Sequence, residues 1–237
     1  MEQQYAKRRK PPLMRLIAPL FIAVVGRIQT IRVRGAEHLP PTGPLIVAAN
    51  HTNHFDGPVL AAVLYENGIP PCTAARADLF NIPVLGWALR QLGQIPIYRP
   101  GVKTTPLGGS GRSSLRALME GLGEGKCLVV FPEGTFTSDP DGWPMKGKTG
   151  LARLVIAHPD TTVVPCAHWG NEELIDLDAR RLRWRKLGRK KTTVDVRFGA
   201  PLDFSEFLDK TVTHDLLTDM TRMVMDAITE QLADIRR

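Results

Sequence analysis

The chain has 237 residues, enough for one large domain with a full hydrophobic core or for a domain with an appendage. Hydrophobic residues make up 43% and charged residues 23%, which is typical of a globular protein, while the formal net charge of +7 favours an anionic partner. That partner could be a nucleic acid, a membrane surface or a phosphorylated substrate. The three cysteines contain no C-x-x-C pair, which argues against a zinc or redox site and favours reduced core thiols in a cytoplasmic protein.

The N-terminal segment, residues 1–28, combines a basic run at 7–10 with ten apolar residues at 16–25. As a helix, ten residues reach about 15 Å, roughly half of a bilayer core, and Pro19, Arg15 and Arg27 weaken a spanning helix further. No small-residue cleavage site precedes Arg27. The segment therefore predicts an interfacial anchor on anionic headgroups, followed by one domain at 29–237. The alternative is a helix that packs on the protein's own core.

The rest of the chain alternates short apolar runs with amphipathic segments, which predicts an α/β fold with a mixed, mostly parallel central sheet flanked by helices. The predicted strands are 31–34, 45–49, 71–75, 94–99, 127–131, 162–167 and 192–198. The predicted helices are 57–65, one after a turn within 78–92, 114–121, 151–157 and 214–235.

His51 and Asp56 lie on the turn between the buried strand 45–49 and the helix that follows it, where open α/β sheets build their sites. Within one helix the two residues would point about 140° apart, so they can meet only if His51 stays in the turn and Asp56 begins the helix. Asn53 is the predicted N-cap. A carboxylate bonded to one imidazole nitrogen leaves the other free to deprotonate a substrate hydroxyl. The alternative is that these are polar turn residues and a helix cap.

Other candidate residues follow further strands. Arg99 ends the strand 94–99, and Glu133 sits in a tight turn after the strand 127–131, so both should face the crevice that holds His51. Lys146 and Lys148 precede the helix 151–157, which predicts a phosphate seat at a helix start. Residues 180–191 include eight Arg or Lys, with a tryptophan among them, as suits a membrane interface.

Four blocks in this order resemble the glycerolipid acyltransferase family, which includes the 1-acylglycerol-3-phosphate acyltransferases. The match covers roughly residues 30–200. The blocks are N-H-T-N-H-F-D at 50–56, I-P-I-Y-R at 95–99, F-P-E-G-T at 131–135 and V-V-P at 163–165.

The resemblance implies transfer of a fatty acyl group from acyl-CoA or acyl carrier protein to a lysophospholipid hydroxyl, above all that of 1-acylglycerol-3-phosphate, to give phosphatidate. It implies no metal or organic cofactor, and it places the protein on the cytoplasmic face of the cell membrane as a peripheral or monotopic protein. By position, the general base would be His51 and its orienting group Asp56. Substrate-binding residues would be Glu133, Gly134 and Thr135 of the third block, with Arg99 on the phosphate and Pro165 on the wall of the acyl site.

Two positions depart from the family pattern. Phe136 and Thr137 stand where Arg-Ser is common, and Tyr98 precedes Arg99 where an acidic residue is common. Either Lys146, Lys148 or Arg112 supplies the missing charge, which is the favoured reading, or the acceptor is a lipid other than lysophosphatidate.

Three rival functions remain open on the sequence. A metal-dependent hydrolase could use His51, His54 and Asp56, although H-x2-H-x-D matches neither the metallo-β-lactamase spacing nor H-E-x-x-H. A membrane-binding module could keep the fold without the activity. Nucleic-acid binding rests on charge alone, since no motif of a known reader is present, so no nucleic-acid partner is expected.

Overall fold

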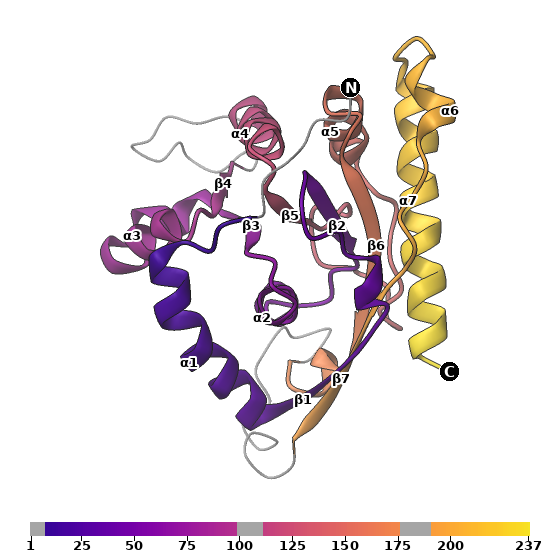
Figure 1. Cartoon of the computed structure of the whole chain (residues 1–237). Coiled ribbons are helices and arrows are strands. Elements are labelled where there is room, and N and C mark those ends of the chain that lie inside the picture. Colours follow the sequence, from indigo (N-terminus) through magenta and orange to yellow (C-terminus); the bar gives the residue numbers. More distant parts are fainter. Residues whose placement is uncertain (1–7, 99–110, 176–190) are drawn as a thin grey trace.

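A computed structural model describes residues 8–98, 111–175 and 191–237, and in them a 7-stranded sheet forms the centre of the molecule (Figure 1). The strand order is β1-β7-β6-β2-β5-β3-β4, and all neighbours are parallel except β6 and β7. The predicted mixed, mostly parallel sheet is confirmed. The strands are β1 Gln29–Arg34, β2 Leu45–Ala49, β3 Pro71–Arg76, β4 Ile95–Ile97, β5 Cys127–Val130, β6 Thr162–Trp169 and β7 Thr192–Phe198.

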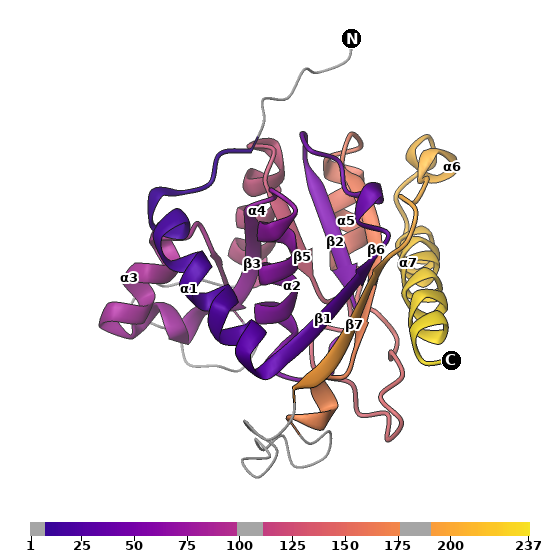
Figure 2. The same ribbon diagram turned by 60° about the horizontal axis from the view of Figure 1, so that its bottom comes forward.

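Helices cover both faces of this sheet, as Figures 1 and 2 show. The α-helices are α1 Pro12–Ile28, α2 Asp56–Glu66, α3 Pro83–Gln91, α4 Gly111–Gly123, α5 Gly150–Ala157, α6 Ser205–Leu208 and α7 His214–Ile235. Short 3-10 helices are η1 Ala36–His38, η2 Ala77–Asn81 and η3 Asn171–Glu173.

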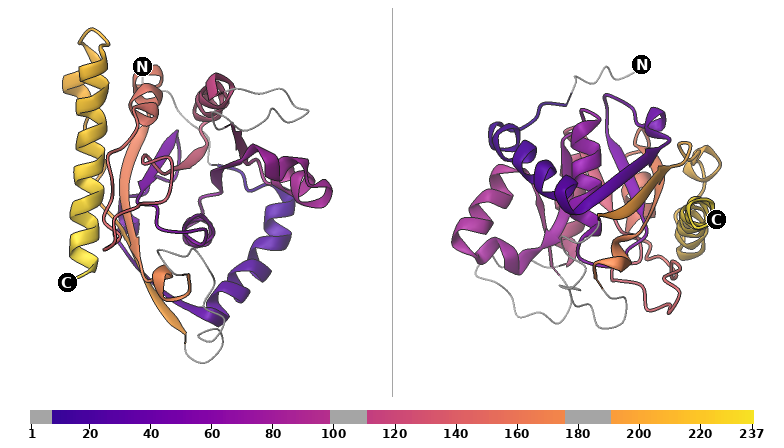
Figure 3. Two further views of the ribbon diagram at one scale, coloured as in Figure 1. Left: turned by 180° about the vertical axis from the view of Figure 1, so that it is seen from behind. Right: turned by 90° about the horizontal axis from the view of Figure 1, so that it is seen from below.

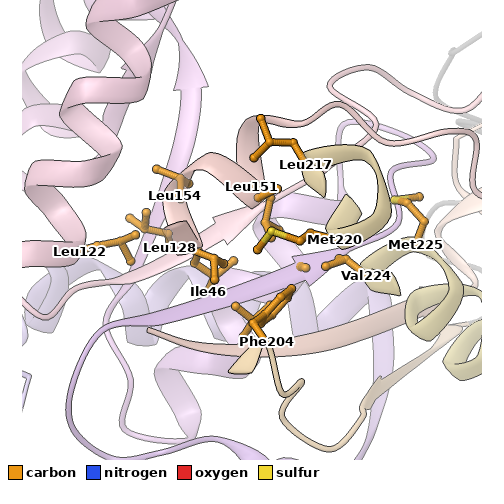
Figure 4. Close-up of a cluster of buried hydrophobic side chains, with 14 of the residues drawn as sticks. Ile46, Leu122, Leu128, Leu151, Leu154, Phe204, Leu217, Met220, Val224 and Met225 are labelled. Atoms are coloured by element: carbon orange, nitrogen blue, oxygen red, sulfur yellow. The ribbon is translucent and has the colours of Figure 1, made fainter. Parts of the chain in front are cut away.

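The central strand β2 separates two hydrophobic clusters. Ile46 and Ala48 face one side and pack with α4, α5 and α7, whereas Leu45, Val47 and Ala49 face the other side and pack with α2. This alternation follows from the two-residue period of a strand, and all five residues are fully buried because helices cover both faces. Figure 4 shows the first cluster between the sheet and α7. The continuous apolar run of β2 is what made this strand recognisable in the sequence.

Helix α1 buries one side on the body of the protein and exposes another. Met14, Ala18 and Val25 are buried, while Leu16 and Leu20 are more than two-thirds exposed. Among the described helices, none is both long enough and apolar enough to cross a membrane. The alternative in which α1 packs on the protein's own core is therefore correct for one face of the helix only.

Several boundaries differ from the prediction. Helix α2 begins at Asp56 with Phe55 in the cap position, so Asn53 is not the N-cap, although its side chain accepts a hydrogen bond from the Phe55 amide at 2.9 Å. Strand β6 continues through Trp169 instead of ending before His168. The segments at 99 and 180–190, which carry predicted basic residues, lie outside the described residues.

Candidate active site

The carboxyl ends of the parallel strands β2, β5 and β6 meet at one edge of the sheet, and each end delivers a polar group there. His51 follows β2, Glu133 follows β5, and His168 is the last residue but one of β6. Figure 3 shows the same edge from behind and from below. The site is therefore assembled from segments far apart in the chain, as the 82-residue separation of His51 and Glu133 illustrates.

His51 and Asp56 are in direct contact, because His51 lies in the turn and Asp56 is the first residue of α2, the one arrangement in which the sequence allowed them to meet. The Nδ1 atom of His51 lies 3.0 Å from Oδ2 of Asp56, which is fully buried. Since an ionised carboxylate only accepts hydrogen bonds, Nδ1 carries the ring proton and Nε2 is left as the acceptor. The same Oδ2 accepts the backbone N–H groups of Thr52 and Asn53 at 2.6 and 2.8 Å, so the turn wraps around the carboxylate.

The environment holds Asp56 ionised. Burial raises the pKa of Asp56, but the facing His168, the hydrogen bond from His51 and the N–H of Asn53 outweigh burial, so its pKa is lowered overall. Nδ1 of His168 lies 3.7 Å from Oδ1 of Asp56. A buried carboxylate that stays charged can orient the imidazole and stabilise its protonated form.

Aromatic rings shield much of the imidazole of His51 from solvent. Phe131 stacks on it at 3.9 Å with 14° between the planes, and Phe136 lies 4.4 Å away at a tilt. Burial is the largest influence on the pKa of His51 and lowers it, although the contact with Asp56 acts in the opposite direction. The ring is therefore neutral near pH 7 and able to accept a proton.

A second set of buried polar residues supports Asp56 from behind, and the sequence reasoning missed all of it. Asn171 Nδ2 donates to Oδ1 of Asp56 at 3.0 Å, and Gln29 Nε2 donates to Oδ1 of Asn171 at 2.8 Å. Asn50 exchanges backbone and side-chain hydrogen bonds with His168, whose Nε2–H donates to the Asn50 carbonyl at 2.8 Å. A usable signal existed only for Asn50 and His168, because both are polar residues at strand ends.

Glu133 lies beside His51, but both of its carboxylate oxygens are engaged by backbone. Oε1 accepts the N–H of His51 and Oε2 accepts the N–H of Met145, each at 2.9 Å. Burial is the main influence on the pKa of Glu133 and raises it. Glu133 thus links the turn that carries His51 to the segment at Met145, and its contact with the glycerol portion of a substrate remains a prediction.

A cavity of about 380 Å³ opens beside His51. Its polar rim includes Arg76, Tyr98 and Lys148, and its inner wall is apolar. Arg76 was not predicted, although it ends β3 at the same sheet edge and the rule that selected Arg99 applies to it equally. The apolar lining residues are Ala74, Ile97, Leu115, Leu118, Val130, Phe131, Pro132, Leu151 and Leu154.

The remaining predicted residues divide clearly. Gly134 lines the cavity next to Lys148, at a φ of 70° that favours glycine, and a Cβ there would lie 3.0 Å from the Lys148 Nζ atom. Lys146 and Thr135 are exposed and do not line the cavity. Pro165 is buried within β6, where its carbonyl accepts the Gly199 amide, and it does not line the cavity either. Arg99 and the side chain of Arg112 lie outside the described residues.

The donor set that a metal-dependent hydrolase would need does not come together. Within the described parts of the chain, no group of three or more His, Cys, Asp or Glu side chains is arranged to hold a metal ion. His54 instead packs edge-on against Phe136 at 4.6 Å. The local geometry thus offers no basis for that rival function.

Comparison with known proteins identifies the family. A sequence model described as "Acyltransferase" matches residues 30–169, which is more than half of the chain. The protein belongs to the acyltransferase family. The resemblance inferred from the four blocks is thereby confirmed. Three of the blocks lie wholly in the described part of this acyltransferase, and the fourth, at 95–99, lacks only its last residue there.

Two relatives illustrate the range of this family. The acyltransferase is 28% identical over 134 residues to the chloroplastic 1-acyl-sn-glycerol-3-phosphate acyltransferase LPAT1 of Arabidopsis thaliana, covering 53% of this chain and 35% of that protein. It is 33% identical over 110 residues to a lyso-ornithine lipid O-acyltransferase of Pseudomonas aeruginosa, covering 46% of this chain and 36% of that protein. The matched regions span little more than a third of these relatives.

A solved structure shares the fold. The crystal structure of the 1-acyl-sn-glycerophosphate acyltransferase PlsC from Thermotoga maritima aligns with a TM-score of 0.63 at 22% sequence identity. The alignment covers 92% of this chain and 78% of that chain. At this identity the likeness establishes the common fold, while the substrate of the present acyltransferase needs its own argument.

Proposed function

We propose that this protein transfers a fatty acyl group from a thioester donor, acyl-CoA or acyl carrier protein, to the free hydroxyl of a lysophospholipid. The favoured acceptor is 1-acylglycerol-3-phosphate, and the product is then phosphatidate, a step of phospholipid biosynthesis. The observation that carries the proposal is the 3.0 Å contact of a buried carboxylate with an imidazole that lines a largely apolar cavity.

The reaction follows from the state of the two side chains. Nε2 of His51 accepts the proton of the acceptor hydroxyl as that oxygen attacks the thioester carbonyl and forms a tetrahedral intermediate. The intermediate then collapses, the carbon–sulfur bond breaks, and the imidazolium returns the proton to the departing thiolate. Asp56 stabilises the imidazolium between these steps. A thioester is already activated, so the chemistry requires no resident metal or cofactor.

The inner wall of the cavity suits the acyl chain. Leu115 and Leu118 of α4 and Leu151 and Leu154 of α5 all line it, and all four side chains are apolar. A volume of about 380 Å³ falls in the range of ordinary ligand sites. Burial of a hydrocarbon chain there would contribute roughly 0.8 kcal/mol for each methylene removed from water.

Cations at the rim suit the phosphate of the acceptor. Arg76 and Lys148 both line the cavity, although Arg76 is ion-paired with Asp78. Lys148 precedes the start of α5, and a helix start is a favourable place for an anion. Lys148 thus offers a charge close to the third block, where the family's arginine is replaced by Phe136. Arg99, by its position in the second block, would add a further cation.

A different lipid acceptor is the second candidate. Phe136 removes a phosphate-binding arginine from the expected position, and one relative of this chain is named for a lyso-ornithine lipid. A zwitterionic acceptor would need less cationic charge than lysophosphatidate does.

A peripheral location on the cytoplasmic face of the membrane completes the proposal, because the acceptor lipid resides in the bilayer. The exposed apolar side of α1 and the basic residues at 7–10 support attachment of the N-terminal segment to anionic headgroups.

One experiment tests the proposal directly. Purified protein is incubated with labelled acyl-CoA or acyl carrier protein and a panel of lysolipids, and the products are identified by mass. Labelled phosphatidate is expected, with none formed by His51→Ala. His214→Ala, which changes an exposed histidine on α7, is the matched control. Transfer only to lyso-ornithine lipid would select the second acceptor, and no transfer to any lysolipid would refute the proposal.

A further inference from the structure

Exposed apolar side chains gather on two segments of the described chain. Eight of the ten large hydrophobic residues that are exposed belong to α1 or to the η2–α3 segment. The two others, Val33 and Val212, are isolated on other elements. Such a concentration is unusual for a soluble surface and marks an interaction site. The eight residues are Leu16, Leu20, Phe21, Val24, Ile82, Val84, Leu85 and Trp87.

The two segments are neighbours in space although they are far apart in sequence. Helix α1 packs against α3, and Figures 1, 2 and 3 all show them side by side, on the opposite side of the molecule from α7. On α1, Leu16, Leu20 and Val24 recur every four residues and therefore form one stripe. The apolar surface is thus shared between two contacting helices.

Helix α3 is packed tightly against η2. Gly86 is buried so closely against η2 that a Cβ would lie 2.1 Å from the Phe80 carbonyl oxygen. The same oxygen accepts a hydrogen bond from Arg90 at 2.9 Å. These contacts hold α3 with Val84 and Trp87 directed outward, 79% and 54% exposed.

Charge selects the kind of partner. Neither α1 nor α3 contains an acidic residue, while Arg15 and Arg27 of α1 and Arg90 of α3 are exposed. The η2 part of the surface contains one acidic residue, Asp78, which is ion-paired with Arg76 at 2.6 Å. An apolar surface with this excess of arginines complements a bilayer with anionic headgroups, where apolar side chains enter the acyl boundary and cations remain at the headgroups. Tryptophan also favours that interface.

We propose that α1 and η2–α3 together form one membrane-docking surface, with α3 as its second apolar element beside the N-terminal helix. The partner is a bilayer that contains anionic lipid, and the proposal is independent of acyl transfer. It also explains how lipid reaches the site, since η2 begins directly after Arg76, which lines the cavity rim.

The test measures binding of the full chain, without substrates, to phosphatidylcholine vesicles with and without phosphatidylglycerol. Replacing two apolar residues of α3, as Val84→Gln with Trp87→Gln, should lower the partition coefficient on the anionic vesicles roughly tenfold or more, because two apolar side chains no longer enter the lipid. The matched control is Val212→Gln, whose side chain is 52% exposed on the segment before α7. It should bind like the wild type.

Two outcomes would overturn this proposal. The double variant could bind anionic vesicles as tightly as the wild type, which would leave docking to α1 alone. Alternatively, the wild type could fail to bind vesicles and form a dimer that the double variant dissociates in sedimentation experiments, so that a second copy covers the surface. Because acyl transfer to detergent-dispersed lipid is measured separately, failure of docking is distinguishable from failure of the enzymatic proposal.

A different observation carries a second inference, which rests on the proposed acyl transfer. A buried hydrogen-bond chain runs from Gln29 through Asn171 to Asp56, and the residue at its start is the C-cap of α1. The carboxylate only accepts, so Asn171 must present its NH₂ group to Asp56 and its oxygen to Gln29. Gln29 must then donate. The orientation of both amides follows from the charge of one carboxylate.

We infer that Asn171, held by Gln29, is a positioning residue that keeps Oδ2 of Asp56 aligned with His51. Asn171 and Gln29 are 0% and 1% exposed, so neither can touch the substrate, and each acts only through the next residue. Four other titratable groups surround the pair: His168 from β6, His54 from the same turn, Glu133 after β5, and Glu172 of η3 through Thr52.

The test compares two single variants, Asn171→Leu and the nearly isosteric Gln29→Met, with the wild type. Loss of the Asn171 donor should lower kcat roughly tenfold, with a smaller loss for Gln29→Met, as is typical for outer partners of a catalytic group. The acid limb of the pH profile of kcat/KM should also move to lower pH, because a less well aligned Asp56 supports the charged imidazole less and the pKa of His51 falls.

Proton NMR of the folded protein gives a readout that does not depend on activity. The signal of the His51 Nδ1–H should shift or broaden in Asn171→Leu. A lower kcat with an unmoved acid limb and an unchanged Nδ1–H signal would assign Asn171 a purely structural role. If the wild type shows no acyl transfer but Asn171→Leu still alters the His51 Nδ1–H signal, the enzymatic proposal is refuted and the positioning of Asp56 by Asn171 is supported.

Discussion

The two sides of the His51–Asp56 pair are built on opposite principles. The cavity in front of the imidazole is lined by the cationic side chains of Arg76 and Lys148 and by apolar side chains. Behind the carboxylate lies a buried polar network in which Asn171 and the backbone of Thr52 and Asn53 donate to one group. The front can vary with the substrate, whereas the back must satisfy every donor and acceptor, because a buried unpaired polar group is costly.

The largest expected effect is at the front, where His51→Ala removes the proton acceptor. Acyl transfer should fall on the order of 10²–10⁴-fold, because the group that accepts the hydroxyl proton is lost. Vesicle binding should be unchanged. Turnover close to that of the wild type would mean that His51 is not the base.

Asp56→Asn disrupts the polar network behind the His51–Asp56 pair and should affect both activity and stability. In the wild type the carboxylate accepts hydrogen bonds from several N–H donors, whereas the NH₂ group of an asparagine would oppose some of those donors. We therefore expect a rate loss on the order of 10²-fold or more and a loss of unfolding free energy of about 3 kcal/mol. The pKa of Asp56 is lowered in the fold, so its stabilising contribution is present above its unfolded pKa near 3.8 and is lost as pH falls further.

Denaturant titrations from pH 7 down to acid pH measure this contribution. The difference in unfolding free energy between wild type and Asp56→Asn should shrink as pH falls below the unfolded pKa of the carboxyl. A difference that stays constant with pH would show that the variant loses packing rather than a charged acceptor.

Glu133→Gln tests the link between the two sides. The glutamine oxygen can still accept one backbone N–H, but its NH₂ group opposes the other, so the loop at Met145 should detach from the His51 turn. A rate loss of roughly tenfold is expected, because the turn carrying the base is no longer held. Stability should change by only about 1–2 kcal/mol, since the raised pKa of Glu133 shows that its charged form is already costly to bury.

Kinetics with a fixed acyl donor and varied lysolipid resolve what Glu133 does. A positioning role predicts a lower kcat with little change in KM for the lysolipid. A selective rise in that KM would instead support the direct glycerol contact that the family pattern implies.

The smallest effect on total rate, but the sharpest on selectivity, is expected from Leu118 on the inner cavity wall. Leu118→Phe should shorten the space for the acyl chain and lower kcat/KM for long donors about tenfold relative to short ones. Leu118→Ala should shift the preference toward longer donors. A series of acyl-CoA chain lengths measures both, and identical profiles for the two variants would remove Leu118 from the acyl site.

The elements that were predictable are those whose pattern is local. Strand β2 and helix α7 match their predicted bounds because a continuous buried run and a regular amphipathic stripe are each set by residues close in sequence. The end of β6 was misplaced because His168 is polar, and only its burial against Asn50 shows why it belongs inside the strand. The predicted N-cap of α2 was also wrong: Asn53 accepts the Phe55 amide in the turn, but Phe55 and not Asn53 immediately precedes the helix.

What the sequence by itself determined is the family and the alternating α/β order, because motif blocks and hydrophobic periods are each set by residues close in sequence. For His51 and Asp56 it determined only the condition under which they could meet. Only the tertiary structure decided the support behind that pair: Asn171 is 115 residues from Asp56 and 142 from Gln29, and no local pattern encodes such a contact. Folding likewise brings α1 beside α3 and gives the exposed apolar surface two parts. Burial and hydrogen-bond partners are properties of the packed chain, so residues that act through them become visible only once the chain is folded.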